Sequence, residues 1–433
     1  MNPHRIFFAL FLAFALFLTG CTDTPAVSEP QTSDISTMES TSSSVTTTAN
    51  STEADKTNGT APSVGNTTTA GTVVQTGFAD ATQTESKATT ATTTKRATTT
   101  TKKTEGKSEN MVEFIGRFQK ISDTTYKFEW AGSTITAGFT GTEIGIRLRT
   151  LKNANHDKDY FNVSIDGGES FLLVTDMSRV EYTLATGLKD GYHTVRVTKR
   201  TEAQFSSQFQ FEGFLYGSSQ PAPAPARKTR RIEIYGDSIS AGYGNEAKEN
   251  GFRLNEENID KTYGALAAAA LDAEYTVIAL SGHGMYESLS QSTTEVTPKY
   301  FDRILHKNDV KYKFDQPAPD VVVIHLGTND ANMGVSMADY RKAYLRFVAN
   351  IRRQYPDAYI VCTTAGGNTT VWDTIDEVVN MRKQLYSDVK IGHFIYMYDD
   401  IAGTVGADGH PSVYGHQQIG DALTAYIQEK LGW

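Results

Sequence analysis

The second half of the chain alternates between short apolar runs and longer amphipathic segments, and this alternation restricts the possible folds most. Runs such as Val321-Val322-Val323-Ile324 are apolar at every position, so both faces of such a strand must be covered. Strands that alternate with helices predict a parallel sheet with helices packed on it. In chain order, the expected elements are Arg231–Tyr235, Thr262–Leu271, Tyr275–Leu280, Val321–Leu326, Met337–Arg353, Tyr359–Thr363, Thr374–Leu385, Ile391–Tyr396 and Val413–Leu431.

Residues 111–220 show a different pattern, with short segments of period-two alternation separated by turn residues. Aromatic and β-branched residues in this arrangement are typical of strands, so the region predicts an all-β sandwich. Proline favours extended backbone and blocks ladder hydrogen bonds, so the Pro-Ala repeat in residues 221–230 predicts a stiff joint before an α/β domain of residues 231–433. The clearest expected strands are Phe128–Gly132, Glu143–Leu148, Tyr160–Gly168 and His193–Val197.

The first 110 residues predict no folded domain. Residues 1–21 have the form of an export signal, with Arg5 followed by an apolar run and then Leu18-Thr19-Gly20-Cys21. Small residues before a cysteine resemble the lipobox of bacterial lipoproteins and predict lipidation of Cys21; the alternative is an ordinary signal peptide with an incidental cysteine. Residues 22–110 are dominated by Thr, Ser and Ala and lack periodic apolar positions, so we expect an extended, disordered linker there. These features predict an extracellular lipoprotein anchored to the cell surface.

The charge and cysteine content narrow the possible partners. A formal net charge of −9 gives no electrostatic reason to expect nucleic acid as a partner, and a neutral substrate fits better. The chain has 2 cysteines, so lipidation of Cys21 would leave Cys362 without a disulfide partner. Cys362 lies in an apolar run and is expected to be a small core residue.

Four loops at the expected carboxyl ends of the strands carry residues suited to acyl transfer. Ser238 follows the first strand, Gly282 the next and Asn329 the third, while His410 lies just before the last helix. Ligands bind beyond the carboxyl ends of strands in open sheets of this kind. A serine hydroxyl needs a base, and a glycine N–H and an asparagine NH₂ can donate to an oxygen that becomes negative. Each loop taken alone also fits an ordinary turn.

Taken together, the four loops carry a family resemblance. They read Gly236-Asp237-Ser238, Ser281-Gly282-His283-Gly284, Gly327-Thr328-Asn329-Asp330 and Asp408-Gly409-His410-Pro411. In this order they resemble the SGNH hydrolases, also called GDS-type acylhydrolases, whose catalytic domain is a three-layer, flavodoxin-like α/β fold. The segments Gly116-Arg117-Phe118, Trp130-Ala131-Gly132-Ser133 and Phe139-Thr140-Gly141-Thr142 in a β-sandwich or jelly-roll domain ahead of it are similar to carbohydrate esterase family 2. The resemblance covers about Glu113 to Trp433.

The resemblance implies roles for these residues. Ser238 would be the nucleophile and His410 its base, with the Ser238 N–H, the Gly282 N–H and the Asn329 side chain as oxyanion donors. Most SGNH enzymes carry the orienting aspartate three residues before the histidine, where this chain has Ala407. Asp408 or a backbone carbonyl is therefore expected to orient the imidazole.

The resemblance also implies a reaction and a substrate. The expected function is removal of acetyl groups from plant polysaccharides such as xylan or glucomannan through an acetyl-enzyme, by a monomer that needs no metal and no cofactor. Trp372 and Gly409 are candidates for sugar binding, although a core position for Trp372 fits equally well. Two alternatives stay open: an esterase for cell-wall or lipid acyl groups, and a noncatalytic glycan-binding lipoprotein.

Overall fold

A computed structural model of the chain describes residues 110–152, 158–398 and 405–433. The described residues belong to one compact unit. The predicted signal segment with Cys21, and the predicted linker up to residue 109, lie outside the described residues. Within the described part of the chain, no helix has the length and hydrophobicity needed to cross a membrane.

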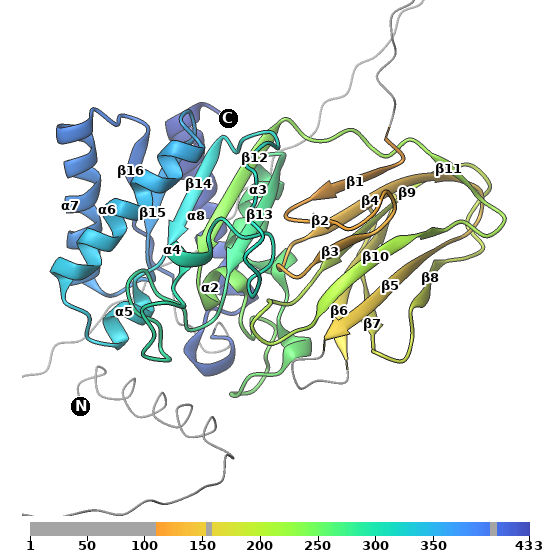
Figure 1. Cartoon of the computed structure of the whole chain (residues 1–433), viewed down its shortest axis with the longest axis horizontal. Helices are drawn as coiled ribbons and strands as arrows, with labels where there is room; N and C mark the ends of the chain where they lie inside the picture. Colours follow the sequence, from red (N-terminus) through yellow and green to blue (C-terminus); the bar gives the residue numbers. More distant parts are fainter. Residues whose placement is uncertain (1–109, 153–157, 399–404) are drawn as a thin grey trace, which may run out of the picture. The chain divides into compact units, whose positions relative to one another are not determined.

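The α/β domain is built on five parallel strands in the order β13-β12-β14-β15-β16 (Figure 1). All four pairings between neighbouring strands are parallel, so the predicted parallel sheet is confirmed. This order is the flavodoxin-like one. The strands are β12 (Arg230–Gly236), β13 (Ala273–Ala279), β14 (Val321–His325), β15 (Tyr359–Thr363) and β16 (Ile391–His393).

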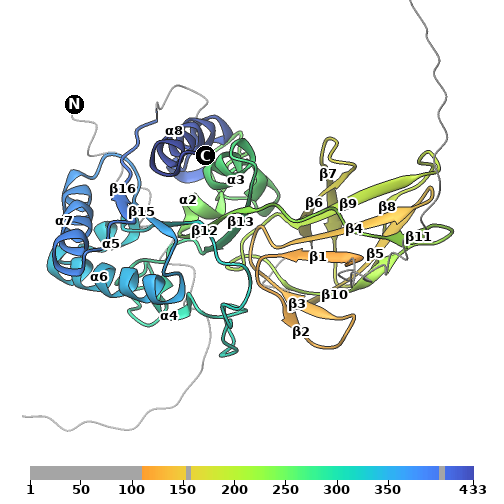
Figure 2. The ribbon, with the colours of Figure 1, turned by 90° about the horizontal axis from the view of Figure 1, so that it is seen from above.

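Helices cover both faces of this sheet (Figure 2). One face buries the apolar sides of α6 (Met337–Gln354) and α7 (Thr369–Tyr386). The other face buries those of α3 (Tyr263–Ala270) and α8 (Val413–Leu431). The shorter helices are α2 (Ser238–Ala241), η3 (Leu254–Glu256), η4 (Ile259–Lys261), α4 (Thr297–Tyr300), α5 (Thr328–Asn332) and η5 (Ala407–Gly409).

The preceding β-domain consists of two antiparallel sheets that share one apolar core. One sheet has the order β1-β4-β9-β6-β7 with β11 beside β4, and the other has the order β2-β3-β10-β5-β8. Phe139 and Val163 from the first sheet and Phe128 and Phe209 from the second are buried in one cluster, as a sandwich requires. The finer jelly-roll topology stays a prediction. The strands are β1 (Val112–Ile115), β2 (Gln119–Lys120), β3 (Tyr126–Phe128), β4 (Thr134–Thr140), β5 (Ile144–Lys152), β6 (Asp159–Ile165), β7 (Phe171–Thr175), β8 (Glu181–Ala185), β9 (Tyr192–Lys199), β10 (Gln208–Leu215) and β11 (Gln220–Ala222).

Two of the expected strands in this part of the chain end earlier than predicted, and part of the predicted joint is itself a strand. The strand predicted for Phe128–Gly132 ends at Phe128, because Trp130 leaves the sheet and donates its indole N–H to the Ile304 carbonyl at 2.8 Å. The strand predicted for Tyr160–Gly168 ends at Ile165, and Asp166 begins a turn with φ of 54°. Pro221, expected in the joint, lies instead in β11, whose pairing with β4 at the sheet edge tolerates a missing N–H.

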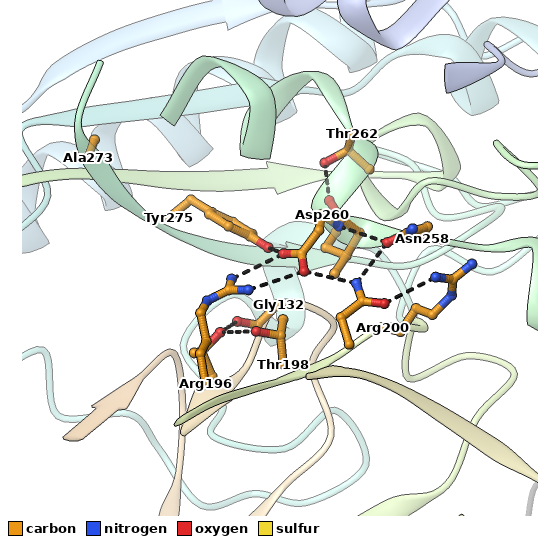
Figure 3. A network of polar contacts seen from close by, with 12 residues as sticks. Gly132, Arg196, Thr198, Arg200, Asn258, Asp260, Thr262, Ala273 and Tyr275 are labelled. Atoms are coloured by element: carbon orange, nitrogen blue, oxygen red, sulfur yellow. Dashed lines mark hydrogen bonds and ion pairs between the residues drawn. The ribbon is translucent and has the colours of Figure 1, made fainter. Parts of the chain in front are cut away.

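Polar contacts join the β-domain to the α/β domain (Figure 3). Arg196 of β9 forms an ion pair with Asp260 of η4 at 3.1 Å, and the Tyr275 hydroxyl of β13 donates to the same carboxylate at 2.5 Å. Asn162 of β6 donates to Asp260 at 2.8 Å and accepts from Arg200 at 3.1 Å. The two domains are therefore held by buried and half-buried groups from several strands, which restricts their relative motion.

Candidate active site

The four predicted loops meet at the carboxyl edge of the parallel sheet. Ser238 begins α2 directly after β12, and Gly282 follows β13. Asn329 lies in α5 directly after β14, and His410 lies between η5 and α8. Parallel strands end at the same edge of a sheet, so the loops that follow them are neighbours although they are far apart in sequence.

The serine and the histidine are in direct contact. His410 Nε2 lies 2.7 Å from Ser238 Oγ, and His410 Nδ1 lies 3.1 Å from the Ala407 carbonyl oxygen. A carbonyl can only accept, so Nδ1 carries the proton, and Nε2 is left with a lone pair that accepts from the serine hydroxyl. The pair thus has the tautomer needed to withdraw the Ser238 proton.

The Ala407 backbone, rather than the Asp408 carboxylate, faces His410 Nδ1. Asp408 adopts a left-handed φ of 51°, and its carboxylate accepts from the Tyr243 hydroxyl at 3.1 Å. The Ala407 side chain is fully buried and packs closely against Gly244. A Cβ added to Gly244 would lie 2.3 Å from the Cβ of Ala407. Of the two predicted ways to orient the imidazole, the structure therefore shows the backbone carbonyl.

The three candidate oxyanion donors lie on this same edge. Asn329 is buried and donates its side-chain NH₂ to the His283 carbonyl at 2.8 Å, with a longer contact of 3.4 Å to Asp237. Gly282 has φ of 79°, a left-handed conformation that favours glycine. Within the described residues, its N–H donates to no protein acceptor.

Burial shifts the pKa values of two groups at the site. The pKa of His410 is lowered from the ordinary 6.5, chiefly because burial disfavours the charged imidazolium, while the Ala407 carbonyl and the Asp408 charge oppose this shift. Burial raises the pKa of the Asp237 carboxyl, next to Ser238 in sequence, to about 7. At neutral pH His410 is therefore uncharged and able to act as a base.

Trp372, Gly409 and His325 complete the set of residues that the sequence singled out. Trp372 is half-buried in the first turn of α7, which begins at Thr369 rather than at the predicted Thr374 because Asn368 caps it. Gly409 is exposed beside His410. His325 is buried, with its ring nitrogens 2.9 Å from the Tyr396 hydroxyl and 3.3 Å from Ser240, as expected of a core histidine. No group of acidic, histidine or cysteine side chains in the described residues is arranged to hold a metal ion.

Comparisons with known proteins match each of the two domains to a protein family. A model described as "Carbohydrate esterase 2 N-terminal" matches residues 114–225, and one described as "GDSL-like Lipase/Acylhydrolase family" matches residues 234–418. A family two carbohydrate esterase from Clostridium thermocellum, solved in complex with cellohexaose, is 32% identical with a TM-score of 0.68, and the match covers 74% of this chain and 99% of that chain. This chain belongs to carbohydrate esterase family 2.

Two relatives of this family 2 chain have names that state activities. Cellulase/esterase CelE of Acetivibrio thermocellus is 34% identical over 335 residues, and the match covers 74% of this chain. It covers only 40% of the length of CelE, which is much the longer protein. An acetylxylan esterase / glucomannan deacetylase of Cellvibrio japonicus is 26% identical, with 71% of this chain and 87% of that protein covered.

Two residues that shape the site of this family 2 chain were not predicted from the sequence. The Asp330 carboxylate accepts the backbone N–H groups of Met285, Tyr286 and Glu287 at 2.7 to 3.0 Å and so fixes the loop that follows Gly282. The Tyr243 ring packs on the His410 ring with centroids 4.5 Å apart. Asp330 follows Asn329 in the third loop and Tyr243 follows Ser238 in the first, but their targets are distant in sequence, so no local pattern identified them.

Proposed function

We propose that the protein is a serine esterase that hydrolyses acetyl esters on plant polysaccharides such as xylan and glucomannan. The observation that carries this proposal is the 2.7 Å contact between Ser238 Oγ and His410 Nε2, with Nδ1 held by the Ala407 carbonyl. This pairing provides a hydroxyl nucleophile with a positioned base at the carboxyl edge of the sheet. Family membership supports an acyl ester, and the names of the relatives support acetylated xylan and glucomannan as substrates.

The reaction would run in two steps through an acetyl-enzyme. His410 Nε2 takes the Ser238 proton while Oγ attacks the acetyl carbonyl, and the imidazolium then protonates the sugar oxygen as it leaves. In the second step, His410 Nε2 takes a proton from water as the water oxygen attacks the acetyl carbonyl, and the imidazolium then returns this proton to Ser238 Oγ as acetic acid leaves and ionises to acetate. The same base thus serves both steps.

The negative oxygen of each tetrahedral intermediate would be bound by the Ser238 N–H, the Gly282 N–H and the Asn329 amide. The bond to the His283 carbonyl fixes the plane of the Asn329 amide. The second amide hydrogen, which otherwise makes only the longer contact with Asp237, would then bond the oxyanion. Preorganised donors of this kind each lower the barrier by roughly 3 kcal/mol. Because the donors are in place before the substrate arrives, little reorganisation is needed during the reaction.

The sugar itself would contact residues around the mouth of the site. Trp372 is half-buried at the start of α7, directly after the loop that follows β15, and Gly409 is exposed beside the base. An indole ring can stack on a pyranose ring, and a glycine leaves room for a bulky alcohol close to His410. These positions support both residues as sugar contacts.

A substrate panel tests the function directly. Acetate release would be measured from acetylated xylan, acetylated glucomannan, O-acetylated peptidoglycan and a long-chain ester. The proposal expects the two plant polysaccharides to be the fastest substrates. Faster hydrolysis of peptidoglycan or of the long-chain ester would favour the cell-wall or lipid alternative. No hydrolysis of any ester, together with no labelling of Ser238 by a fluorophosphonate, would favour the noncatalytic glycan-binding protein.

The geometry around Asp408 gives one expected result for a substitution. Asp408→Asn should keep kcat within about threefold of the wild-type value, because His410 Nδ1 is held by the Ala407 carbonyl and not by this carboxylate. Steady-state kinetics on 4-nitrophenyl acetate measure the effect. A loss of about a thousandfold or more would instead show that Asp408 acts as a third triad member.

The pH dependence of the reaction should report the lowered pKa of His410. The base must be neutral to accept the Ser238 proton, so kcat/KM falls as the pH drops through the His410 pKa, and the acid limb should be centred below 6.5. A profile of kcat/KM between about pH 4 and pH 8 measures the limb. A limb centred near 7 would point to the buried Asp237 carboxyl as the controlling group instead.

We also propose that the protein is an extracellular monomer attached to the membrane through a lipid on Cys21. The support is the pair of small residues Thr19-Gly20 directly before this cysteine, after the apolar run that ends at Leu18, and the Thr-rich stretch after it, which is suited to act as a tether. Incorporation of labelled palmitate by the wild type and its absence in Cys21→Ser would support the anchor. Equal labelling of the two proteins would contradict it.

A further inference from the structure

A buried glutamate of the β-domain contacts the loop that carries Gly282. Glu202 lies between β9 and β10 and is 0% exposed. Its carboxylate accepts the backbone N–H of Ser281 at 2.7 Å and also accepts the Ser281 hydroxyl. Ser281 directly precedes Gly282, whose N–H is a candidate oxyanion donor. The β-domain therefore reaches to within one peptide unit of the proposed reaction centre.

Glu202 is itself held in place by groups from both domains. Its backbone carbonyl accepts from the Ser206 hydroxyl, and Ser206 Oγ accepts from the Lys199 ammonium at 2.5 Å. The Glu202 N–H donates to the carboxylate of Glu257 at 3.3 Å. Lys199 and Glu257 are both fully buried, so this support excludes water and allows little movement.

The contact fixes the direction of the Gly282 N–H. Two bonds from one carboxylate hold both the backbone and the side chain of Ser281, while the Gly282 carbonyl accepts from the Leu289 N–H at 2.8 Å. The peptide unit between Ser281 and Gly282 is therefore held on both sides. Burial of a carboxylate is costly unless it is well hydrogen-bonded, and these two donors supply that compensation.

We propose that Glu202 is a positioning residue for the oxyanion donors, so that the β-domain completes the active site rather than acting only as a separate module. The same loop supports the base, because Phe205 packs on Tyr243 with ring centroids 6.1 Å apart, and Tyr243 packs on His410. This inference rests on the proposed esterase function and adds a residue to it from the other domain.

The test is the substitution Glu202→Gln in the full chain. The introduced amide can still accept the Ser281 N–H, but it meets Ser281 Oγ only as a donor to a reversed hydroxyl, so two bonds to a carboxylate become weaker bonds to a neutral amide and the loop is held less firmly. We expect kcat on 4-nitrophenyl acetate to fall by about 10- to 100-fold, with KM within about twofold of the wild-type value, because the donors act mainly in the transition state. A purely structural role would lower the melting temperature without this selective loss of kcat.

Glu274→Gln is the matched control. Glu274 is a buried carboxylate at the amino end of β13, the strand that leads to Ser281, and it accepts two bonds of 2.6 Å from Arg227. The same chemical change there breaks a charged contact at the opposite edge of the sheet. We expect a lower melting temperature with kcat within about twofold of the wild-type value. The proposal is overturned if folded Glu202→Gln has the same kcat as this control, or if only its KM changes.

Two further measurements keep the outcome decisive. If Glu202→Gln does not fold, Ser281→Ala removes one of the two contacts and should lower kcat by about 3- to 10-fold; an unchanged kcat would overturn the proposal. Fluorophosphonate labelling of Ser238 depends on the same donors but needs no acetyl substrate. Its rate should therefore fall in parallel with kcat. A wild type that is labelled normally but releases no acetate from polysaccharides would contradict the proposed function. The role of Glu202 would still be tested by the labelling rate and by kcat on 4-nitrophenyl acetate.

Discussion

Replacing Ser238 with alanine should lower acetate release from acetylated xylan or glucomannan by at least about 10⁴-fold. The variant keeps His410 and the oxyanion donors but has no oxygen to form the acetyl-enzyme, so only residual activation of water through these groups remains. Steady-state acetate release, with protein concentrations high enough to detect slow turnover, measures the loss. The absence of fluorophosphonate labelling in the variant should accompany it.

Ser240→Ala is the control for this substitution. Ser240 lies on the same short helix, is buried, and has its hydroxyl 2.8 Å from the Tyr263 hydroxyl, so the change removes a similar group without touching the proposed reaction centre. We expect the control to lose some stability, about 1 kcal/mol, and to keep most of its activity. Equal acetate release by wild type and Ser238→Ala would mean that another group carries the reaction.

Much of the α/β domain could be predicted because its signals are local. The run Val321–Ile324 is apolar at every position, and the structure buries it at the centre of the sheet as β14. The loops after β12, β13 and β14 could be placed on one edge because parallel strands share their carboxyl ends. The same argument brought Ser238 and His410 together, although they are separated by 172 positions.

What the sequence did not reveal depends on contacts between the domains. Trp130 continues the alternation of a strand, yet it leaves the sheet because Ile304 of the other domain offers an acceptor for its indole N–H. Nothing in the sequence around Glu202 distinguishes it from an ordinary loop residue. Only the packing of the two domains brings its carboxylate to Ser281. The orientation of His410 was also undecided, because a backbone carbonyl such as that of Ala407 leaves no mark in a sequence.

Replacing His410 with alanine should lower kcat by about 10⁴- to 10⁶-fold, comparable to the loss from Ser238→Ala. The Ser238 hydroxyl would keep its position but lose the acceptor that lies 2.7 Å away, so Oγ would have to attack with its proton still attached. The leaving sugar oxygen would also lose its proton donor. Acetate release and the rate of fluorophosphonate labelling should therefore fall together, since both need an activated Oγ.

The double variant distinguishes a working pair from two independent contributions. If His410 acts only through Ser238, then Ser238→Ala/His410→Ala should release acetate about as slowly as either single variant, because the second change removes a group that no longer has a function. The residual rate in all three would come from the oxyanion donors and substrate binding. Losses that multiply, so that the double variant is slower than the singles by the product of both effects, would contradict the mechanism in which one proton passes between Oγ and Nε2.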